Sequence, residues 1–276
     1  MLISVVVTTY NRPLALKMVL QALRDQTDTN FEVIVADDGS REETRLMIDS
    51  IQSSLGYPLV HAWQEDKGFR AARARNLAVL KAKGEYLVFL DGDSVPRVDF
   101  IENHRKLAES GYLVAGNRLL LSKELTQTLE ATCETIHNWS MIQWIRCYLA
   151  RKINRLLPLL NLSKIALGRK LKSNSWQKVR TCNLGVWKRD FEAVNGFDCS
   201  YEGWGFEDSD LAIRLLKLGV YKKNGSFATG VLHLWHNEFD RSHEDENFNR
   251  LQSLLKNSHL KAAIGLKELQ SGVGRC

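Results

Sequence analysis

The feature that most constrains the fold is a series of short apolar runs in the first third of the chain. An uninterrupted apolar run of this length is typical of a strand that is buried on both faces of a sheet. Amphipathic stretches between the runs predict helices, so the pattern predicts an α/β fold with a central, mostly parallel sheet flanked by helices. The runs are Leu2–Thr8, Phe31–Ala36, Pro58–Trp63 and Tyr86–Leu90.

A cluster of polar residues follows each run, and the positions of these clusters predict where a ligand binds. Parallel strands end at the same edge of a sheet, and open α/β sheets bind ligands at the carboxyl ends of their strands. We therefore expect one site built from clusters that are far apart in the chain. The clusters are Thr8–Arg12, Asp37–Ser40, Gln64–Arg70 and Asp91–Ser94.

The composition is typical of a folded protein with a substantial core. Of the 276 residues, 44% are hydrophobic, and no apolar stretch approaches the roughly 20 residues that span a bilayer. The five cysteines are odd in number, and no pair has the spacing of a zinc finger or a redox motif. Polar residues directly after the first apolar run argue against a signal peptide. We therefore expect reduced thiols and a cytoplasmic protein.

Positive charge is concentrated in one segment of the chain. Ten of the 38 Lys and Arg residues lie within residues 146–180, which contain no Asp or Glu, leaving 28 basic against 32 acidic residues elsewhere. The surrounding residues 124–180 read as helical and amphipathic. A solvated helical face has this composition, and so does a helix that lies on an anionic membrane surface. We expect the second, with the protein docked on the inner face of the cell membrane.

Asp91 and Asp93 follow a buried strand and are separated by a glycine. Hard divalent cations take oxygen ligands, and Mg²⁺ or Mn²⁺ typically bridges one or two carboxylates to the phosphates of a substrate. Gly92 would let a diphosphate approach the backbone. A solvated loop is the alternative for such a triplet on its own, but the neighbouring polar clusters favour a cation site.

The other clusters contain groups that suit a nucleotide. Asp38 ends a strand, where a carboxylate can accept hydrogen bonds from a base or a ribose, although Asp-Gly-Ser is also good turn chemistry. Tyr10 could stack on a base or simply lie at a rim. Arg70 and Arg75 lie near the start of a helix, where anions are favoured, although surface arginines are common there.

A second group of candidates lies late in the chain. Glu207 and Asp208 follow a glycine-rich turn that contains Trp204, and they begin a helix. A carboxylate there could be a general base or a helix cap, and an indole could line a sugar site. His233 and His236 are three residues apart at the end of a strand. Only one of them is an easy metal ligand unless the chain turns between them.

Together these motifs resemble those of the inverting family-2 glycosyltransferases, which have the GT-A fold. The resemblance covers roughly residues 1–120 and 180–240. The late motif Gly203–Asp208 is similar to that of the branch that includes galactosyltransferases and chondroitin polymerases, although this branch usually has a glycine where the chain has Phe206. The motifs of the first part are Val5–Pro13, Ala36–Ser40, Gly68–Asn76 and Leu90–Asp93.

The resemblance implies an enzyme that transfers a sugar from a UDP-sugar to a saccharide or lipid-linked saccharide, with Mn²⁺ or Mg²⁺ as cofactor. Asp208 is then the base and Glu207 holds sugar hydroxyls. Asp93 is a metal ligand with His236, and His233 is the second choice. We assign the donor to Thr8, Tyr10, Arg12, Asp38, Arg70, Arg75 and Asp91, and the acceptor to Trp204 and Asn183.

Two other classes of function fit the sequence less well, and a third stays open. A dinucleotide oxidoreductase is disfavoured because no G-x-G-x-x-G follows the first strand. Nucleic acid is not expected as a partner because the chain outside the basic segment is acidic and has no recognition motif. A non-catalytic module that binds a sugar nucleotide or a glycan stays open. We divide the chain into a nucleotide-sugar-binding half (1–120), the basic segment (121–180) and a catalytic half (181–276).

Overall fold

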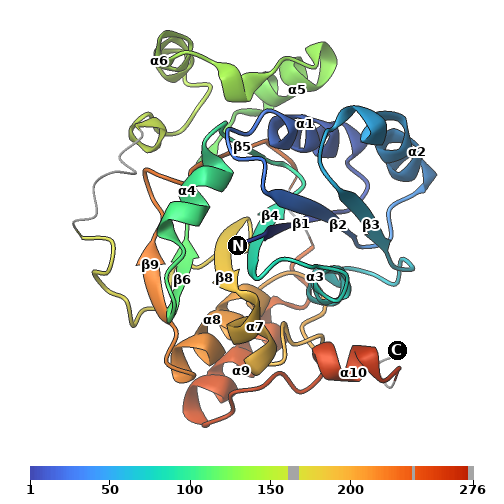
Figure 1. Ribbon diagram of the computed structural model, residues 1–276, viewed down its shortest axis with the longest axis vertical. Helices are drawn as coiled ribbons and strands as arrows, with labels where there is room; N and C mark the ends of the chain where they lie inside the picture. Colours follow the sequence, from blue (N-terminus) through green and yellow to red (C-terminus); the bar gives the residue numbers. More distant parts are fainter. Residues whose placement is uncertain (161–167, 238–239, 273–276) are drawn as a thin grey trace.

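The computed structural model describes residues 1–160, 168–237 and 240–272, and a seven-stranded sheet forms its centre (Figure 1). The strands are β1 (Ile3–Thr9), β2 (Phe31–Asp37), β3 (Leu59–Trp63), β4 (Tyr86–Asp91), β6 (Tyr112–Ala115), β8 (Asn183–Trp187) and β9 (Tyr221–Asn224). Their order in the sheet is β3-β2-β1-β4-β8-β6-β9. The first four in this order are parallel, β8 is antiparallel to both of its neighbours, and β9 is parallel to β6.

The register of the four parallel strands aligns their polar ends. Thr8 lies opposite Asp91, and Thr9 lies opposite Asp37. Asp37 in turn pairs with Trp63 at the end of β3. The polar clusters after these strands therefore meet at one edge of the sheet, which is where ligands of such sheets bind.

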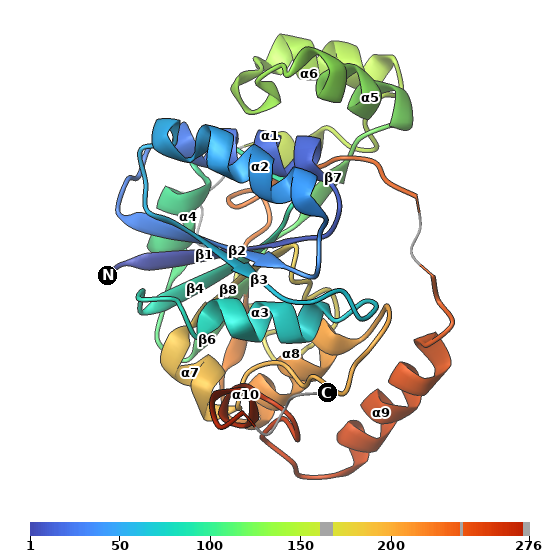
Figure 2. The same ribbon diagram turned by 90° about the vertical axis from the view of Figure 1, so that its right-hand side faces the viewer.

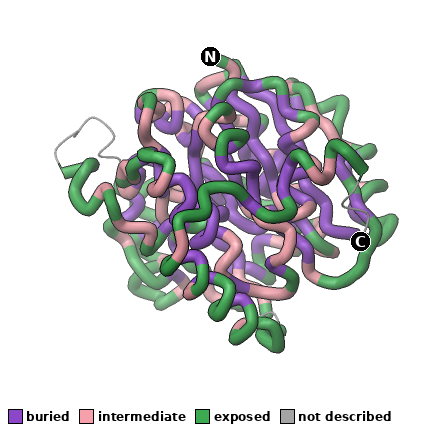
Figure 3. The backbone as a smooth tube through the Cα atoms, turned by 90° about the horizontal axis from the view of Figure 1, so that it is seen from below, coloured by how far each residue is buried: buried purple, intermediate pink, exposed green. Residues whose placement is uncertain are grey.

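Strand β1 is buried on both faces because its valines alternate between two cores. Val5 and Val7 belong to the cluster that includes the buried side chains of α1 (Pro13–Arg24), whereas Val6 packs in the cluster of α3 (Ala71–Val79). Figure 3 shows the strands as a buried centre within exposed loops and helices. A strand covered on both faces needs an uninterrupted apolar run, and the sequence supplies one.

Helices form a layer on each face of the sheet (Figure 2). The predicted α/β class is therefore confirmed, although the sheet is mixed at the β8 end. The helix expected to start near Arg70 and Arg75 is present as α3 and ends at Val79. One face carries α1 and α2 (Glu42–Ile51), the other carries α3, α7 (Lys188–Ala193) and α8 (Glu207–Lys217), and the remaining helices of the body are α4 (Phe100–Leu107), α9 (Glu244–Lys256) and α10 (Leu266–Gln270).

A second, three-stranded sheet consists of β5 (Ser94–Pro96), β7 (Arg118–Leu120) and β10 (Val231–His233). Strand β10 is antiparallel to β5, and this pairing places His233 opposite Ser94. The strand ends at His233, and the chain turns directly after it. This turn brings the late histidines to the end of β4.

The middle of the chain forms a helical arm beyond α1 and α2 (Figures 1 and 2), which we define as α5 (Lys123–Thr132), η2 (Ile136–Asn138) and α6 (Met141–Leu149). The helical prediction for residues 124–180 is wrong after α6. Residues 150–160 contain the 3₁₀ helix η3 (Leu157–Leu159) and an isolated antiparallel bridge between Ile153 and Leu121, residues 168–180 form turns, and residues 161–167 lie outside the described residues. Pro158 cannot donate a helix hydrogen bond and interrupts a helix in residues 150–160. Residues 168–180 carry charge without an apolar stripe, so helix formation there would gain no packing energy.

The described part of the chain has neither a membrane-spanning helix nor a disulfide bond. None of its helices is long and apolar enough to cross a lipid bilayer. Its cysteines are free thiols, and they are Cys133, Cys147, Cys182 and Cys199.

Candidate active site

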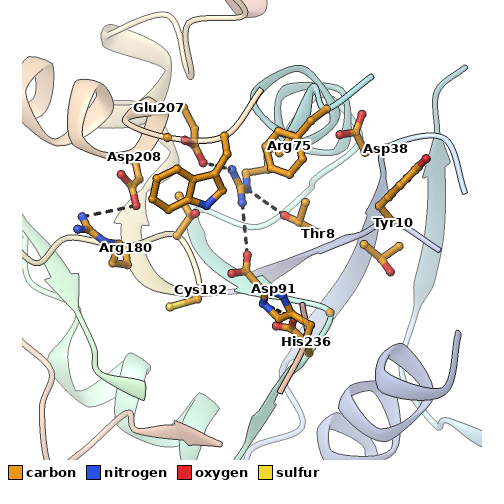
Figure 4. Close-up of a pocket in the computed structure, with 18 of the residues that line it drawn as sticks. Thr8, Tyr10, Asp38, Arg75, Asp91, Arg180, Cys182, Glu207, Asp208 and His236 are labelled. Atoms are coloured by element: carbon orange, nitrogen blue, oxygen red, sulfur yellow. Dashed lines mark hydrogen bonds and ion pairs between the residues drawn. The ribbon is translucent and has the colours of Figure 1, made fainter. Parts of the chain in front are cut away.

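A cavity of about 360 Å³ opens at the edge of the sheet where the parallel strands end (Figure 4). Its walls come from the ends of β1 and β4, the start of α3, and the turn that leads into α8. All of the predicted site residues except Arg70 and Asn183 line it. These are Thr8, Tyr10, Arg12, Asp38, Arg75, Asp91, Asp93, Trp204, Glu207, Asp208, His233 and His236.

The guanidinium of Arg75 connects three walls of the cavity (Figure 4). It is buried, and it donates to Thr8 Oγ1 at 2.9 Å, to Glu207 Oε1 at 3.0 Å and to Asp91 Oδ1 at 3.3 Å. A buried cation is tolerated only when carboxylates and hydrogen bonds surround it. Arg75 therefore fixes β1, β4 and α8 relative to one another.

Asp38 is a buried carboxylate at the end of β2. It accepts hydrogen bonds from the Gln64 side chain and from the backbone N–H of Arg70, the latter at 2.7 Å. Burial raises the pKa of Asp38 to about 6, and the two hydrogen bonds limit this rise because they favour the ionised form. Tyr10 lies at the rim, where its hydroxyl donates to Asp66 at 2.9 Å.

The side chain of Arg70 does not line the cavity, which corrects the prediction that it binds the donor. Its guanidinium instead donates to the backbone carbonyl of Glu65 and lines a separate hollow near α9 and α10. Only the backbone N–H of Arg70 serves the site, because it holds Asp38. A sequence pattern places a residue at a helix start but does not determine in which direction a long side chain points.

Asp93, His233 and His236 form a cluster at the floor of the cavity. Nε2 of His233 lies 3.6 Å from Asp93 Oδ1, and Nε2 of His236 lies 3.5 Å from Asp93 Oδ2. One ligand atom from each residue lies within 4.8 Å of the others. The turn after β10 thus lets both histidines approach one carboxylate, which a regular strand would prevent.

The hydrogen bonding of His236 and the burial of His233 fit a divalent cation. Nδ1 of His236 lies 2.6 Å from the carbonyl oxygen of Asn237. A carbonyl can only accept, so this nitrogen carries the proton and the lone pair lies on Nε2, beside Asp93. Burial lowers the pKa of His233 and favours its neutral form. The cluster therefore offers one carboxylate and two imidazole nitrogens as ligands.

Arg12 contacts this cluster rather than open solvent. Its guanidinium donates to Asp93 Oδ2 and to Glu130 Oε1, each at 3.0 Å, and to the carbonyl oxygen of Trp235 at 3.2 Å. Glu130 belongs to α5 of the helical arm. Arg12 therefore links the arm to the cluster of Asp93, His233 and His236, and all three groups that accept its hydrogen bonds belong to the protein.

Glu207 and Asp208 begin α8, where the helix dipole favours negative charge. Asp208 is buried, and Nη1 of Arg180 lies 3.8 Å from its Oδ2. Burial and the neighbouring charge of Glu207 raise the pKa of Asp208 to about 6, while Arg180 and Arg75 oppose the rise. A carboxylate with this pKa is mostly ionised at pH 7 and is basic enough to accept a proton.

Phe206 precedes α8 with a φ of 73°, a conformation in which glycine is favoured. Its ring packs against Phe248 of α9 with the centroids 5.4 Å apart, which helps to hold this conformation. Phe206 and Trp204 both line the cavity, and the indole of Trp204 lies 4.7 Å from the guanidinium carbon of Arg241. The departure from glycine therefore adds an aromatic wall to the cavity.

Asn183, which was predicted to contact the acceptor, does not line the cavity. Its amide nitrogen donates to the carbonyl oxygens of Asn117 and Thr229, and its Oδ1 lies 3.1 Å from Nε2 of His104. The side chain is buried within the sheet, where it joins β8 to the neighbouring loops. Its role is structural.

Some residues of the cavity were not found from the sequence. Arg180 and Cys182 come from the segment just before β8, and Arg118 comes from β7. Arg180 is the last residue of the basic segment, whose charge the sequence alone assigns to a membrane surface. Phe69 also lines the cavity. The sequence could have indicated it, because Phe69 lies within the polar cluster Gln64–Arg70 that follows a strand.

Comparison with known proteins identifies two matching families. Residues 4–159 match glycosyl transferase family 2. Residues 166–237 match the family described as the N-terminal domain of galactosyltransferase. The second match includes Asp208 and both histidines, so the two matches together contain all of the candidate ligands and bases.

Similar curated proteins are larger than this chain. Validoxylamine A glucosyltransferase of Streptomyces hygroscopicus subsp. jinggangensis is 30% identical over 231 residues, which are 79% of this chain and 52% of that protein. Hyaluronan synthase of Pasteurella multocida and chondroitin synthase of Escherichia coli are each 26% identical, over 80% and 79% of this chain and 23% and 33% of the relatives. The chain thus spans about half or less of the length of these relatives.

Solved structures share the fold at low identity. The structure of Staphylococcus aureus TarS residues 1–349 in complex with UDP has a TM-score of 0.62 and 15% identity, covering 97% of this chain and 68% of that one. A mannosyltransferase from Pyrobaculum calidifontis, solved with GDP-Man and Mn²⁺, has a TM-score of 0.56 and 18% identity, with coverages of 92% and 61%. These likenesses show the GT-A fold that the sequence predicts. With more than half of its residues matched by the family, the chain belongs to glycosyl transferase family 2.

Proposed function

We propose that the chain is an inverting glycosyltransferase that moves a hexose or an N-acetylhexosamine from a UDP-sugar to a hydroxyl of a saccharide acceptor. The observation that carries this proposal is that one cavity holds a buried carboxylate suited to be the base, a cluster of candidate cation ligands and the polar ends of three parallel strands, β1, β2 and β4. The relatives named above as synthases and glucosyltransferases support it, as do the TarS structures with UDP and UDP-GlcNAc.

The donor occupies the β1–β2 side of the cavity. Tyr10 lies at the rim, where its ring can stack on uracil, while Thr8 and Asp38 provide hydrogen bonds to the nucleoside. Asp91 lies between Arg75 and the cluster of Asp93, a position suited to the ribose or to the donor sugar.

Asp93, His233 and His236 would hold a divalent cation. When bound, this cation supplies positive charge for the diphosphate that leaves. Two imidazole nitrogens in the ligand set favour Mn²⁺ over Mg²⁺, because Mg²⁺ prefers a shell of oxygen atoms. Without a bound cation, the guanidinium of Arg12 forms an ion pair with the carboxylate of Asp93.

Asp208 takes the proton of the acceptor hydroxyl. The freed oxygen attacks the anomeric carbon on the face opposite the diphosphate, a new C–O bond forms, and the bond to the diphosphate breaks with inversion. Glu207 stays tied to Arg75 and presents its second oxygen to sugar hydroxyls. Trp204 provides a flat apolar wall for a sugar ring.

The acceptor is a saccharide or a lipid-linked saccharide of bacterial surface polysaccharide or lipopolysaccharide synthesis, presented at the inner face of the cell membrane. The arm supports docking there. Helix α6 exposes Met141, Ile142, Ile145, Tyr148 and Leu149, and there is no acidic residue between Glu134 and Asp190. An apolar stripe within a basic stretch suits an anionic membrane surface. The stripe on α6 (Met141–Leu149) overlaps only the start of residues 146–180, the basic residues expected to contact the membrane.

The substitution Asp208→Asn tests the proposal. Loss of a general base costs about 10²–10⁴-fold in rate, so UDP release from a mixture of UDP-sugar, Mn²⁺ and acceptor should fall by at least 100-fold. Asp245→Asn, at an exposed first turn of α9, is the matched control and should keep the wild-type rate. Wild-type rates in Asp208→Asn would refute the assignment. Donor binding without any turnover by the wild type would favour the non-catalytic module.

A further inference from the structure

We propose that α5 of the helical arm positions the cation ligands through Thr126 and Glu130, so that these two residues set the affinity of the site for its metal ion. The inference rests on the proposed metal site. Neither residue lines the cavity, and neither belongs to any of the motifs that define the site. Both act through a neighbour and are therefore positioning residues.

Thr126 holds the turn that carries the late histidines. Its hydroxyl is buried and accepts a hydrogen bond from the backbone N–H of Trp235 at 2.8 Å. The preceding N–H, that of Leu234, donates to the carbonyl oxygen of Asp93 at 2.8 Å. The turn between His233 and His236 is thus fixed on one side by Asp93 and on the other by α5.

Glu130 acts on the same turn and on Asp93 through one guanidinium. Arg12 donates to Glu130, to Asp93 and to the carbonyl oxygen of Trp235. Without Glu130, the positive charge of Arg12 would be balanced by Asp93 alone, and it would compete more strongly with a cation for that carboxylate. Glu130 therefore leaves Asp93 available as a ligand.

Groups that hydrogen-bond to metal ligands fix the orientation of those ligands and thereby affect the affinity for the metal ion. Loss of such a partner typically lowers metal affinity by about 10–100-fold. The contacts described here start from a helix of the arm rather than from the sheet. The arm is therefore a structural part of the metal site as well as a candidate docking element.

The test is a Mn²⁺ titration of the full chain without donor, with the free ion measured by its electron paramagnetic resonance signal. Thr126→Val and Glu130→Gln should each raise the Kd for Mn²⁺ by about tenfold or more. Thr126→Ser keeps the hydroxyl and should restore the wild-type Kd. Thr128→Val and Glu124→Gln are the matched controls, because both residues lie on the exposed side of α5, and they should leave the Kd unchanged.

The outcomes separate this inference from the proposed function. If Asp93→Asn abolishes binding but Thr126→Val and Glu130→Gln bind as the wild type does, α5 has no positioning role and the metal site stands. If Asp93→Asn and the wild type bind Mn²⁺ equally, the metal assignment itself is wrong and the inference falls with it. Glu130 is partly exposed, so Glu130→Gln decides the question if Thr126→Val does not fold.

Discussion

At the scale of single residues, the chemistry of Asp208 depends on two opposing environments. Burial and the charge of Glu207 raise its pKa to about 6, while the cations of Arg180 and Arg75 oppose this. A carboxylate in water would be a weaker base, and one buried without cations would not ionise at neutral pH. The side chains around Asp208 thus keep it both ionised and basic at pH 7.

The pH dependence of turnover should report this balance. Only ionised Asp208 accepts a proton, so kcat/KM should fall as the pH drops through about 6, to about a tenth of its plateau at pH 5. Arg180→Gln removes a cation that lowers the pKa, so it should move the acidic limb to higher pH. Lys178→Gln, at an exposed site outside the cavity, should leave the profile in place. An unshifted profile in Arg180→Gln would contradict the electrostatic role of this arginine.

The sequence alone predicts the positions of residues that lie at the ends of strands. Asp38, Asp91 and Asp93 lie where the parallel pattern places them, because strand ends are fixed by the register of the sheet. The positions of Arg70 and Asn183 could not be read in the same way. A long or buried polar side chain takes the partners that tertiary packing offers, and these are not encoded by local spacing.

At the scale of elements, the helical arm is the part of the middle segment whose helices could be predicted from the sequence. The stretch up to Leu149 has an apolar stripe at helical spacing and forms α5 and α6. Residues 168–180 have the charge but no stripe, and they form turns against the body, with Arg169 donating to the carbonyl of Asn224. Charge without an apolar stripe therefore did not determine the structure of these residues, and their predicted contact with a membrane stays a prediction.

Flotation with liposomes tests the docking role of α6. Ile142→Asp and Leu149→Asp place charge on the most exposed positions of its apolar stripe and should abolish binding to vesicles with anionic lipid. Leu171→Asp is the matched control, because Leu171 is equally exposed but lies in the turns outside the arm. Equal binding to neutral and anionic vesicles, or a loss of binding in Leu171→Asp alone, would argue against α6 as the docking surface.

At the scale of the whole molecule, one sheet unites the beginning and the end of the chain. Strands β8 and β9 complete the sheet that β1 to β4 begin. The first four strands could be predicted because each is a long apolar run. The antiparallel insertion of β8 and the three-residue strands of the second sheet could not, since short strands carry too little pattern to reveal their partners.

A bound cation should stabilise this whole molecule, because its ligands come from strands that are far apart in the chain. At a Mn²⁺ concentration of 100 times the Kd, the free energy of unfolding should rise by about 2.7 kcal/mol, which a thermal melt would show as a shift of several degrees. EDTA should reverse the shift, and Asp93→Asn should remove it. Asp49→Asn, on an exposed face of α2, should keep it. An equal shift in Asp93→Asn would place the ion elsewhere.

The three bonds of Arg75 have a consequence for attempts to redesign this enzyme. A single guanidinium contacts Thr8 on β1, Asp91 on β4 and Glu207 on α8, which are the proposed nucleoside side, donor-sugar side and base-carrying helix of the cavity. A substitution chosen to admit a new donor will therefore also shift the group that selects the acceptor. Libraries that vary the two ends of the cavity separately will miss the useful combinations, so residues around Arg75 have to be randomised together.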